Sequence, residues 1–384
     1  MGRIRFGTGY RQLALAMAMS SLLAACVAPS EPPPRSTSRP PPVQKKAADR
    51  PVTGPQQKPH VPVFEEVKPV ANPDRQVPPG LETAIRDYWR AFPGKTGVAI
   101  QRIDGDWTVG ERLDDWFPQQ SVSKTWVALA VLEQVDQGRL RLDQTVYIGP
   151  DDLTLFYQPI RTRVLNNGGI NVTIRELLEL SVTTSDCTAN DSLARVAGGP
   201  EAVRSFIARK GLGRIRFGPG ERLLQSGIAG LQWQQDYSRG RNFEAARAKL
   251  PLAQRQAALN RYLADPVDGA SPRAIVGALA KLARGELLSP ASTRLMLDMM
   301  NRTRSGPNRL KAGLPAGWSF GHKTGTGQVL GAVSTGYNDI GIMTAPDGTR
   351  YAIAVMMADT TAAVPDRMVF MQNMSRLGAT FHQR

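Results

Sequence analysis

A serine and a lysine three residues apart, Ser121 and Lys124, form the first pair of side chains that could do chemistry together. They precede the apolar run Thr125 to Val135, which we expect to be a buried helix, and helical residues three apart share one face. A serine hydroxyl becomes an effective nucleophile when a neighbour takes its proton, and a desolvated lysine can do this. The helix N-terminus would also favour developing negative charge. Alone the pair is weak evidence, because composition produces it about once or twice in such a chain.

A second group, Lys323-Thr324-Gly325-Thr326-Gly327, lies on a strand-like run that begins at Trp318. A lysine at a strand edge supplies positive charge for a substrate carboxylate. The small residues beyond it let a ligand lie along the backbone and bind its N–H groups. A similar triplet, Lys95-Thr96-Gly97, precedes Ser121 and lacks the second glycine, so we expect it only to lead into a strand.

A third group, Ser185-Asp186-Cys187, follows a helix that the capping box Thr173-Ile174-Arg175-Glu176 predicts. Ser185 could pass protons between Lys323 and a leaving group. We expect Asp186 to be structural and to accept hydrogen bonds from backbone N–H groups of its loop.

In this order the three groups resemble the motifs of the penicillin-recognising serine enzymes and, within them, of the class A β-lactamases. The resemblance covers about residues 81–384. It implies a serine nucleophile with its lysine, the first two residues of a Ser-Asp-Asn motif, and a Lys-Thr-Gly motif. It also implies an oxyanion hole made by the backbone N–H groups of Ser121 and Thr326. The residues that match the three motifs are Ser121 and Lys124, Ser185 and Asp186, and Lys323, Thr324 and Gly325.

Three further positions match residues that bind substrate or water in this family. The glutamate that positions the hydrolytic water in class A enzymes falls on Glu221, and Gln225 falls where an asparagine usually holds that water. The alternative for Glu221 is a surface acid that stabilises a helix start after Pro219-Gly220. Arg309 resembles the arginine that some members use beside Lys323 to bind a carboxylate, and its alternative is a solvated arginine.

The sequence also departs from the family pattern. Cys187 replaces the asparagine of Ser-Asp-Asn, and a thiol donates and accepts hydrogen bonds only weakly, which predicts weaker recognition of an acylamino side chain. Pro219 replaces an arginine that usually pairs with the aspartate matched here by Asp268, so that ion pair is missing. The chain between Glu221 and Asp268, residues 222–267 and here called the insert, is longer than usual. We expect it to form a lid or a displaced wall that could misplace Glu221 and slow deacylation.

Other positions leave alternatives open or exclude chemistry. Phe156 or Tyr157 could line the mouth of the pocket, although Leu153, Leu155 and Phe156 could equally be core residues. The three histidines, His60, His322 and His382, form no cluster with Cys or carboxylates that predicts a zinc site, so we expect neither a metal nor another cofactor.

The order of predicted elements indicates an α+β fold: an antiparallel five-stranded sheet with flanking helices, plus an all-α part at about residues 121–315. Prolines placed as first helical residues, Pro200, Pro272 and Pro290, support helices in the middle. The predicted strands are Gly97 to Ile103, Trp107 to Gly110, Trp318 to His322, Tyr337 to Met343 and Tyr351 to Met357. The predicted helices in and after the middle include Asn242 to Leu250, Leu252 to Leu263 and Pro365 to Leu377, and a first helix spans Leu81 to Arg90.

The N-terminal region predicts export. Residues 1–25 combine basic residues with the apolar run Leu13 to Leu23, as a signal peptide does, and Leu23-Ala24-Ala25-Cys26 resembles the lipobox of bacterial lipoproteins. Cys26 would then carry the lipid anchor; the alternative is an ordinary signal peptide with an incidental cysteine. Residues 26–80 are a Pro-rich tether, since 15 of the 29 prolines lie between Pro29 and Pro79. We therefore expect the catalytic domain, 81–384, on the periplasmic side of a membrane.

The distribution of charge and the number of cysteines limit which partners and cross-links we expect. The formal net charge is +15, but residues 1–80 hold 11 Lys and Arg against 5 Asp and Glu, and the remaining basic residues are scattered. This argues against nucleic-acid binding. With Cys26 acylated, Cys187 has no disulfide partner. We expect a monomer that takes a β-lactam or peptidoglycan-like small molecule.

These observations predict a serine β-lactamase-like hydrolase that opens a β-lactam ring through an acyl-serine intermediate. One alternative is a penicillin-binding cell-wall peptidase or sensor that acylates on Ser121 but deacylates slowly. The other is a non-catalytic envelope lipoprotein on a retired hydrolase fold.

Overall fold

The computed structural model describes residues 76–105 and 107–382. The predicted signal peptide and Cys26, and most of the predicted tether, lie outside these residues. Within the described part of the chain, no helix combines the length and apolar character needed to cross a membrane.

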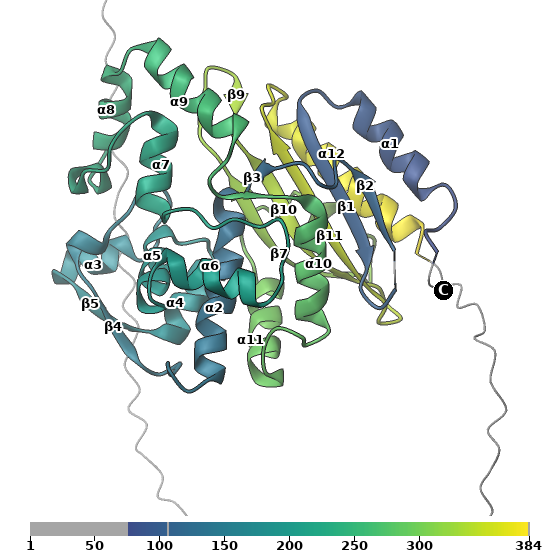
Figure 1. Cartoon of the computed structure of the whole chain (residues 1–384), viewed down its shortest axis with the longest axis horizontal. Coiled ribbons are helices and arrows are strands. Elements are labelled where there is room, and N and C mark those ends of the chain that lie inside the picture. The colour runs from purple at the N-terminus through teal and green to yellow at the C-terminus, as the bar shows by residue number, and fades with distance from the viewer. Residues whose placement is uncertain (1–75, 106, 383–384) are drawn as a thin grey trace, which may run out of the picture. The chain divides into compact units, whose positions relative to one another are not determined.

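The main sheet has five antiparallel strands in the order β2-β1-β11-β10-β7 (Figure 1). Strands from both ends of the domain therefore meet in one sheet, as predicted, and β7, which carries Lys323, lies at its edge. The register pairs Val98 with Val355 and Lys323 with Ile340. The strands are β1 (Lys95–Arg102), β2 (Thr108–Glu111), β7 (Ser319–Thr326), β10 (Tyr337–Thr344) and β11 (Arg350–Ala358).

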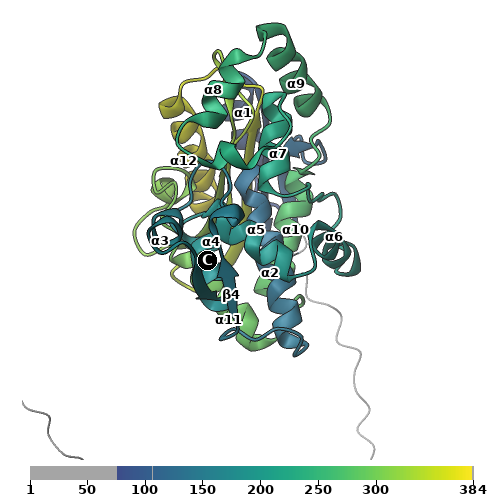
Figure 2. The same cartoon turned by 90° about the vertical axis from the view of Figure 1, so that its left-hand side faces the viewer.

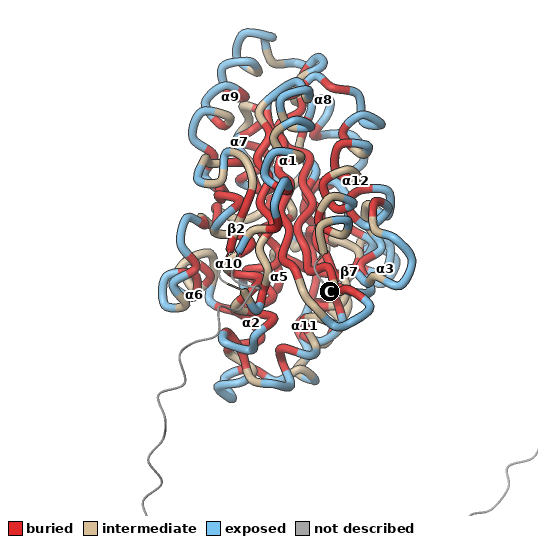
Figure 3. The backbone as a smooth tube through the Cα atoms, turned by 90° about the vertical axis from the view of Figure 1, so that its right-hand side faces the viewer, coloured by how far each residue is buried: buried red, intermediate tan, exposed pale blue. Residues whose placement is uncertain are grey.

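Alternating side chains of the central strands enter two separate cores. On β11, Ile353 and Val355 pack against α1 (Leu81–Ala91) and α12 (Val364–Thr380), whereas Ala354 and Met356 face the helical part of the domain. Strand residues point alternately to opposite faces, so near-continuous apolar strands are expected where both faces are covered. Figure 3 shows the central strands of the sheet buried along most of their length.

The middle of the chain is mainly helical, and the three prolines predicted to begin helices do so at α6, α10 and α11. The helices are α2 (Lys124–Asp136), α3 (Arg161–Asn167), α4 (Ile174–Thr183), α5 (Cys187–Val196), α6 (Pro200–Arg209), α7 (Glu221–Ala229), α8 (Asn242–Lys249), α9 (Leu252–Ala264), α10 (Pro272–Ala283) and α11 (Pro290–Asn301). Residues of the insert form α8 and α9, which lie above α7 in the view of Figure 2.

Three two-stranded sheets accompany the main sheet in the described residues, and one of them lies wholly inside the region 121–315, where the all-α part was predicted. They pair β3 (Phe117–Pro118) with β6 (Gly269–Ala270), β4 (Thr145–Ile148) with β5 (Ile170–Thr173), and β8 (Val329–Leu330) with β9 (Val333–Ser334). Strand β4 alternates exposed and buried residues over only four positions, which is too short a run to stand out from its helical neighbours.

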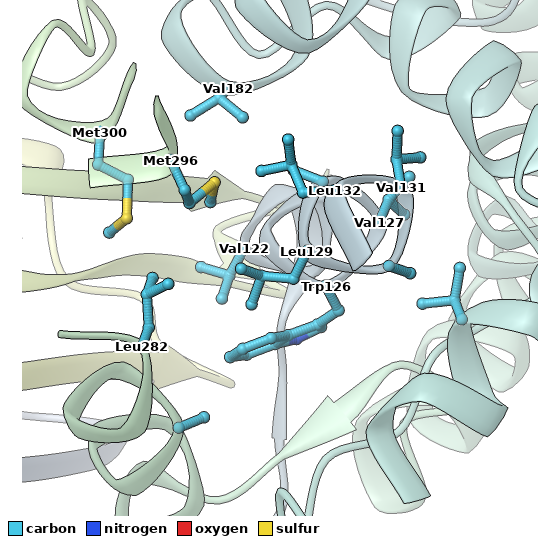
Figure 4. Close-up of a cluster of buried hydrophobic side chains, with 14 of the residues drawn as sticks. Val122, Trp126, Val127, Leu129, Val131, Leu132, Val182, Leu282, Met296 and Met300 are labelled. Atoms are coloured by element: carbon cyan, nitrogen blue, oxygen red, sulfur yellow. The ribbon is translucent and has the colours of Figure 1, made fainter. Parts of the chain in front are cut away.

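Helix α2 forms the centre of the larger core. Trp126 and Leu129 are buried on α2, and Met296 of α11 and Val182 of α4 lie around it in Figure 4. A helix that is apolar on every side must be enclosed by other elements. The start of α2, where Ser121 and Lys124 lie, is thereby held firmly against the sheet.

Candidate active site

The predicted nucleophile lies at the start of α2. Ser121 belongs to a 3₁₀ turn (Gln120–Ser123) that leads into α2, and Lys124 is the first residue of the helix. Lys124 Nζ donates to Ser121 Oγ over 2.7 Å, and the lysine side chain is fully buried. The predicted contact between the two side chains is therefore formed.

The backbone is strained on several sides of this serine. Gln120 has φ 54°, Ser185 has φ 62° and Phe156 has φ 58°, which are left-handed conformations that non-glycine residues adopt only at an energetic cost. Ser185 and Phe156 line the same cavity as Ser121, and Gln120 directly precedes the serine. Strain concentrated around one cavity is typical of a functional site.

Strand β7 forms one wall of the site and lies against the nucleophile segment. Lys323 Nζ donates to Ser185 Oγ over 2.8 Å and to Thr324 O over 3.0 Å. A Cβ atom on Gly325 would lie 2.4 Å from Gln119 O, so only glycine fits there. Thr326 and Ser121 both line the cavity, as an oxyanion hole built from these two residues requires.

Asp186 has the structural role that the sequence predicts. Its Oδ1 accepts from Ala189 N over 2.9 Å and caps α5, and its Oδ2 accepts from Ile160 N over 2.8 Å. The buried carboxylate thus holds the loop that presents Ser185.

Glu221 is the first residue of α7 and is buried, so its interpretation as a surface acid is wrong. Glu221 Oε2 lies 3.8 Å from Lys124 Nζ, and Gln225 Nε2 donates to Glu221 Oε1 over 3.3 Å. The insert does not displace Glu221 from the site. It forms a wall beside it, because Phe243 of α8 packs edge-on against Phe156 with ring centroids 5.4 Å apart.

Cys187 lies between the two charged groups. Its Sγ is 3.5 Å from Lys124 Nζ and 3.4 Å from Glu221 Oε1. Burial, reinforced by the charge of Glu221, raises the pKa of the Cys187 thiol above its usual range. At neutral pH the sulfur is therefore protonated and contributes only weak hydrogen bonds.

The two lysines of the site have opposite pKa shifts. Burial lowers the pKa of Lys124, but the acidic groups beside it, Cys187 and Glu221, act against burial and shift the pKa upward overall. Burial and the nearby charge of Lys124 lower the pKa of Lys323 well below its usual value. Lys323 is thus the lysine that more readily gives up a proton, and a bound carboxylate would restore its charge.

Arg309 is not solvated; its side chain is buried beside β7 and lines the cavity. Its Nη1 donates to Gly325 O over 3.1 Å and to Asn338 O over 2.6 Å, and its Nη2 donates to Thr326 Oγ1 over 2.6 Å. The guanidinium also lies 3.8 Å from the ring centroid of Tyr337. One side chain thereby fixes the edge of β7 and adds positive charge beside Lys323.

These groups surround a cavity of about 570 Å³, the size of a small-molecule site. Phe156 and Tyr157 lie at its mouth and are largely exposed, whereas Leu153 and Leu155 are buried. The core interpretation is therefore wrong for Phe156 and correct for the two leucines. Within residues 76–105 and 107–382, no three His, Cys, Asp or Glu side chains group as metal ligands would.

Asp268 is held without the missing arginine. It accepts from the backbone N of Gln120 over 2.8 Å and from the hydroxyl of Tyr262, in the insert, over 2.8 Å. Sequence analysis missed Gln120 and Tyr262, as well as Ser305, whose hydroxyl bonds to that of Thr324 over 2.7 Å. No motif marks Gln120 or Tyr262, although the position of Gln120 directly before the nucleophile was a usable signal.

Comparison with known proteins agrees with this geometry. The model of the beta-lactamase enzyme family matches residues 80–381. The extended-spectrum beta-lactamase PER-1 of Pseudomonas aeruginosa is 30% identical over 64% of this chain and 68% of its own length. The beta-lactamase VEB-1 of the same organism is 28% identical over 75% of this chain and 86% of its own length.

Solved structures give the same result. The crystal structure of the TLA-3 extended-spectrum beta-lactamase has a TM-score of 0.66 at 25% identity and covers 79% of this chain and 99% of its own. The crystal structure of a beta-lactamase from Chitinophaga pinensis DSM 2588 has a TM-score of 0.65 at 29% identity. The match covers 78% of this chain and 98% of that one. The chain therefore belongs to the beta-lactamase enzyme family, as a class A serine hydrolase that acts on β-lactams.

Proposed function

We propose that Ser121 opens the β-lactam ring and that Glu221 frees the resulting acyl-enzyme, so that the chain turns over. The observation that carries this proposal is that Lys124 Nζ contacts both groups: it lies 2.7 Å from Ser121 Oγ and 3.8 Å from Glu221 Oε2. A nucleophile, a lysine and a buried carboxylate in this order provide both a proton acceptor for attack and a base for hydrolysis.

In acylation, Ser121 Oγ attacks the lactam carbonyl carbon and its proton passes to Lys124, or through a water molecule to Glu221. The oxyanion would accept from the N–H groups of Ser121 and Thr326. The ring C–N bond then breaks, and the nitrogen takes a proton from Ser185, which regains one from Lys323. The proton that left Ser121 is passed on to Lys323, so that Glu221 is again a carboxylate and Lys323 again an ammonium before hydrolysis.

Substrate binding would use the cations on and beside β7. Lys323, Thr324 and Arg309 would bind the carboxylate that β-lactams carry next to the ring nitrogen. In deacylation, Glu221 takes a proton from a water molecule that Gln225 helps to hold, and this water attacks the ester carbonyl. The ester C–O bond then breaks, Glu221 returns the proton to Ser121 Oγ, and the product leaves.

A time course of intact mass after mixing the purified domain with a penicillin tests both halves at once. We expect a transient adduct that disappears, with Ser121→Ala forming none and Glu221→Gln accumulating it at a deacylation rate at least about 100-fold lower. A wild-type adduct that persists would instead support the slow peptidase or sensor. A wild type that never forms an adduct would support the non-catalytic lipoprotein.

We also propose that the chain is exported and anchored by lipid on Cys26, with the tether 26–80 holding a monomeric domain on the periplasmic side. The apolar run and Leu23-Ala24-Ala25-Cys26 support this proposal. Labelled fatty acid should enter the full chain, and Cys26→Ser should abolish labelling and release the protein from the membrane fraction. Cys187→Ser is the matched control and should label like wild type.

A further inference from the structure

Tyr262 brings a hydroxyl from the insert to the base of the active site. It lies on α9, is buried, and contacts Asp268 and Gln120. Its hydroxyl donates to Asp268 Oδ1 over 2.8 Å and accepts from Gln120 Nε2 over 2.7 Å. Burial, and then the charge of Asp268, raise the pKa of Tyr262 well above its usual value, so the phenol keeps its proton.

The direction of these hydrogen bonds is determined by the carboxylate. An ionised carboxylate only accepts, so the single proton of Tyr262 must point to Asp268. The phenol oxygen can then only accept, and the neighbouring NH₂ group of Gln120 satisfies it. This orients the other end of the Gln120 amide, and its Oε1 accepts from Gln225 Nε2 over 3.0 Å.

The carboxylate of Glu221 lies at the other end of this chain of hydrogen bonds and orients the Gln225 amide. Gln225 Nε2 uses its second proton on Glu221 Oε1, at 3.3 Å, and Gln225 Oε1 accepts from Gln328 Nε2, at 2.9 Å. Every amide between Asp268 and Glu221 therefore has one orientation that satisfies its neighbours. All five groups are buried, so water cannot readily replace a lost bond.

We infer that Tyr262 is a positioning residue for hydrolysis, holding Glu221 through Gln120 and Gln225 in place of the missing ion pair to Asp268. Without the hydroxyl, the Gln120 amide is free to turn, and its NH₂ group can then face that of Gln225. Two donors would oppose each other, and Gln225 would leave Glu221. The inference rests on the proposed function, because it assigns Tyr262 to the deacylation half of that reaction.

Tyr262→Phe removes only the hydroxyl and tests this role. We expect deacylation to slow about tenfold with acylation unchanged, so that kcat and KM of a chromogenic cephalosporin fall together at constant kcat/KM. The acyl adduct should accumulate in intact-mass time courses. A merely structural loss would lower the active fraction without changing KM. Tyr237→Phe is the matched control, because Tyr237 lies in the same insert and its hydroxyl has no hydrogen bond within the described residues.

A second variant keeps the test valid if Tyr262→Phe folds poorly. Gln120→Met breaks the same chain of bonds, and we expect the same fall in deacylation. In the double variant, loss of the tyrosine hydroxyl should add nothing, because both changes act through one path. If the wild type turns over and both single variants deacylate at the wild-type rate, the inference about Tyr262 is overturned while the proposed function stands. A wild type that is never acylated would overturn the proposed function and the inference with it.

Discussion

Cys187 and Lys124 are in direct contact, with the sulfur 3.5 Å from the lysine nitrogen. A thiol accepts a hydrogen bond weakly, so this contact satisfies the lysine far less than an amide oxygen would. Lys124 is left with Ser121, at 2.7 Å, and with the charge of Glu221 as its main partners. The residue at 187 therefore influences both the lysine and the part of the pocket that a substrate side chain would meet.

Cys187→Asn should strengthen recognition of acylamino side chains. The new amide can accept from Lys124 and leaves an NH₂ group for a substrate carbonyl, each of which is worth about 1 kcal/mol. We expect kcat/KM to rise several-fold for benzylpenicillin and to change little for 6-aminopenicillanic acid, which lacks the acyl group. Cys187→Ser provides the control of similar size. An equal rise for both substrates would contradict a role in side-chain recognition.

Arg309→Lys should show whether Arg309 acts by charge or by geometry. A lysine retains the charge but cannot reach Gly325 O, Asn338 O and Thr326 Oγ1 from one planar group. We expect kcat/KM to fall about tenfold and the melting temperature to drop. Arg304→Ala is the comparison, because Arg304 lines the same cavity and is exposed, and it should have a smaller effect. An unimpaired Arg309→Lys would show that charge alone is used.

The architecture was predictable because its signals are local. Pro200, Pro272 and Pro290 begin helices as expected, and Thr173 accepts from Glu176 N to cap α4. The strands were predicted from apolar runs that two covered faces require. The β4–β5 pair was missed because each strand has only four residues and its partner lies beyond an intervening helix.

The active-site residues were predictable where a motif carries them and not where packing does. Ser121, Lys124 and Lys323 meet because α2 and β7 are fixed by the whole core. The burial of Arg309 depends on Tyr337 and on the carbonyl of Asn338, far along the chain, and no local pattern indicates it. Tyr262 was hidden for the same reason, since its partner Gln120 is 142 residues away.

Gly325→Ala should impair both folding and activity. Its Cβ would lie 2.4 Å from Gln119 O and 3.2 Å from Val122 N, which would push β7 away from Ser121. We expect a loss of about 1–3 kcal/mol in the free energy of unfolding and a larger relative loss of acylation rate. Gly227→Ala is the control, since Gly227 lies in α7 with open space around it, and alanine should stabilise that helix. Normal acylation in Gly325→Ala would show that the contact is not needed.

The contribution of Asp191 to the free energy of unfolding depends on pH. Its two oxygens accept from Glu221 N over 2.9 and 3.1 Å, and burial, with the charge of Glu221, raises its pKa to about 6. Because this lies above the usual value of 3.8, the contribution of Asp191 to stability is complete below about pH 4. It is lost as the pH rises through about 6, where the folded protein must hold an ionised carboxylate.

Asp191→Asn keeps an acceptor for Glu221 N but has no charge, so it should be more stable than wild type at pH 7.5 and not at pH 4. The two-unit shift sets an upper limit of about 3 kcal/mol, and because Asp191 is partly exposed we expect about 1 kcal/mol in urea unfolding. Asp143→Asn is the control of opposite sign, because the bond from Arg141 lowers the pKa of the exposed Asp143. A difference between Asp191→Asn and wild type that does not change with pH would mean that Asp191 ionises in the folded protein without cost.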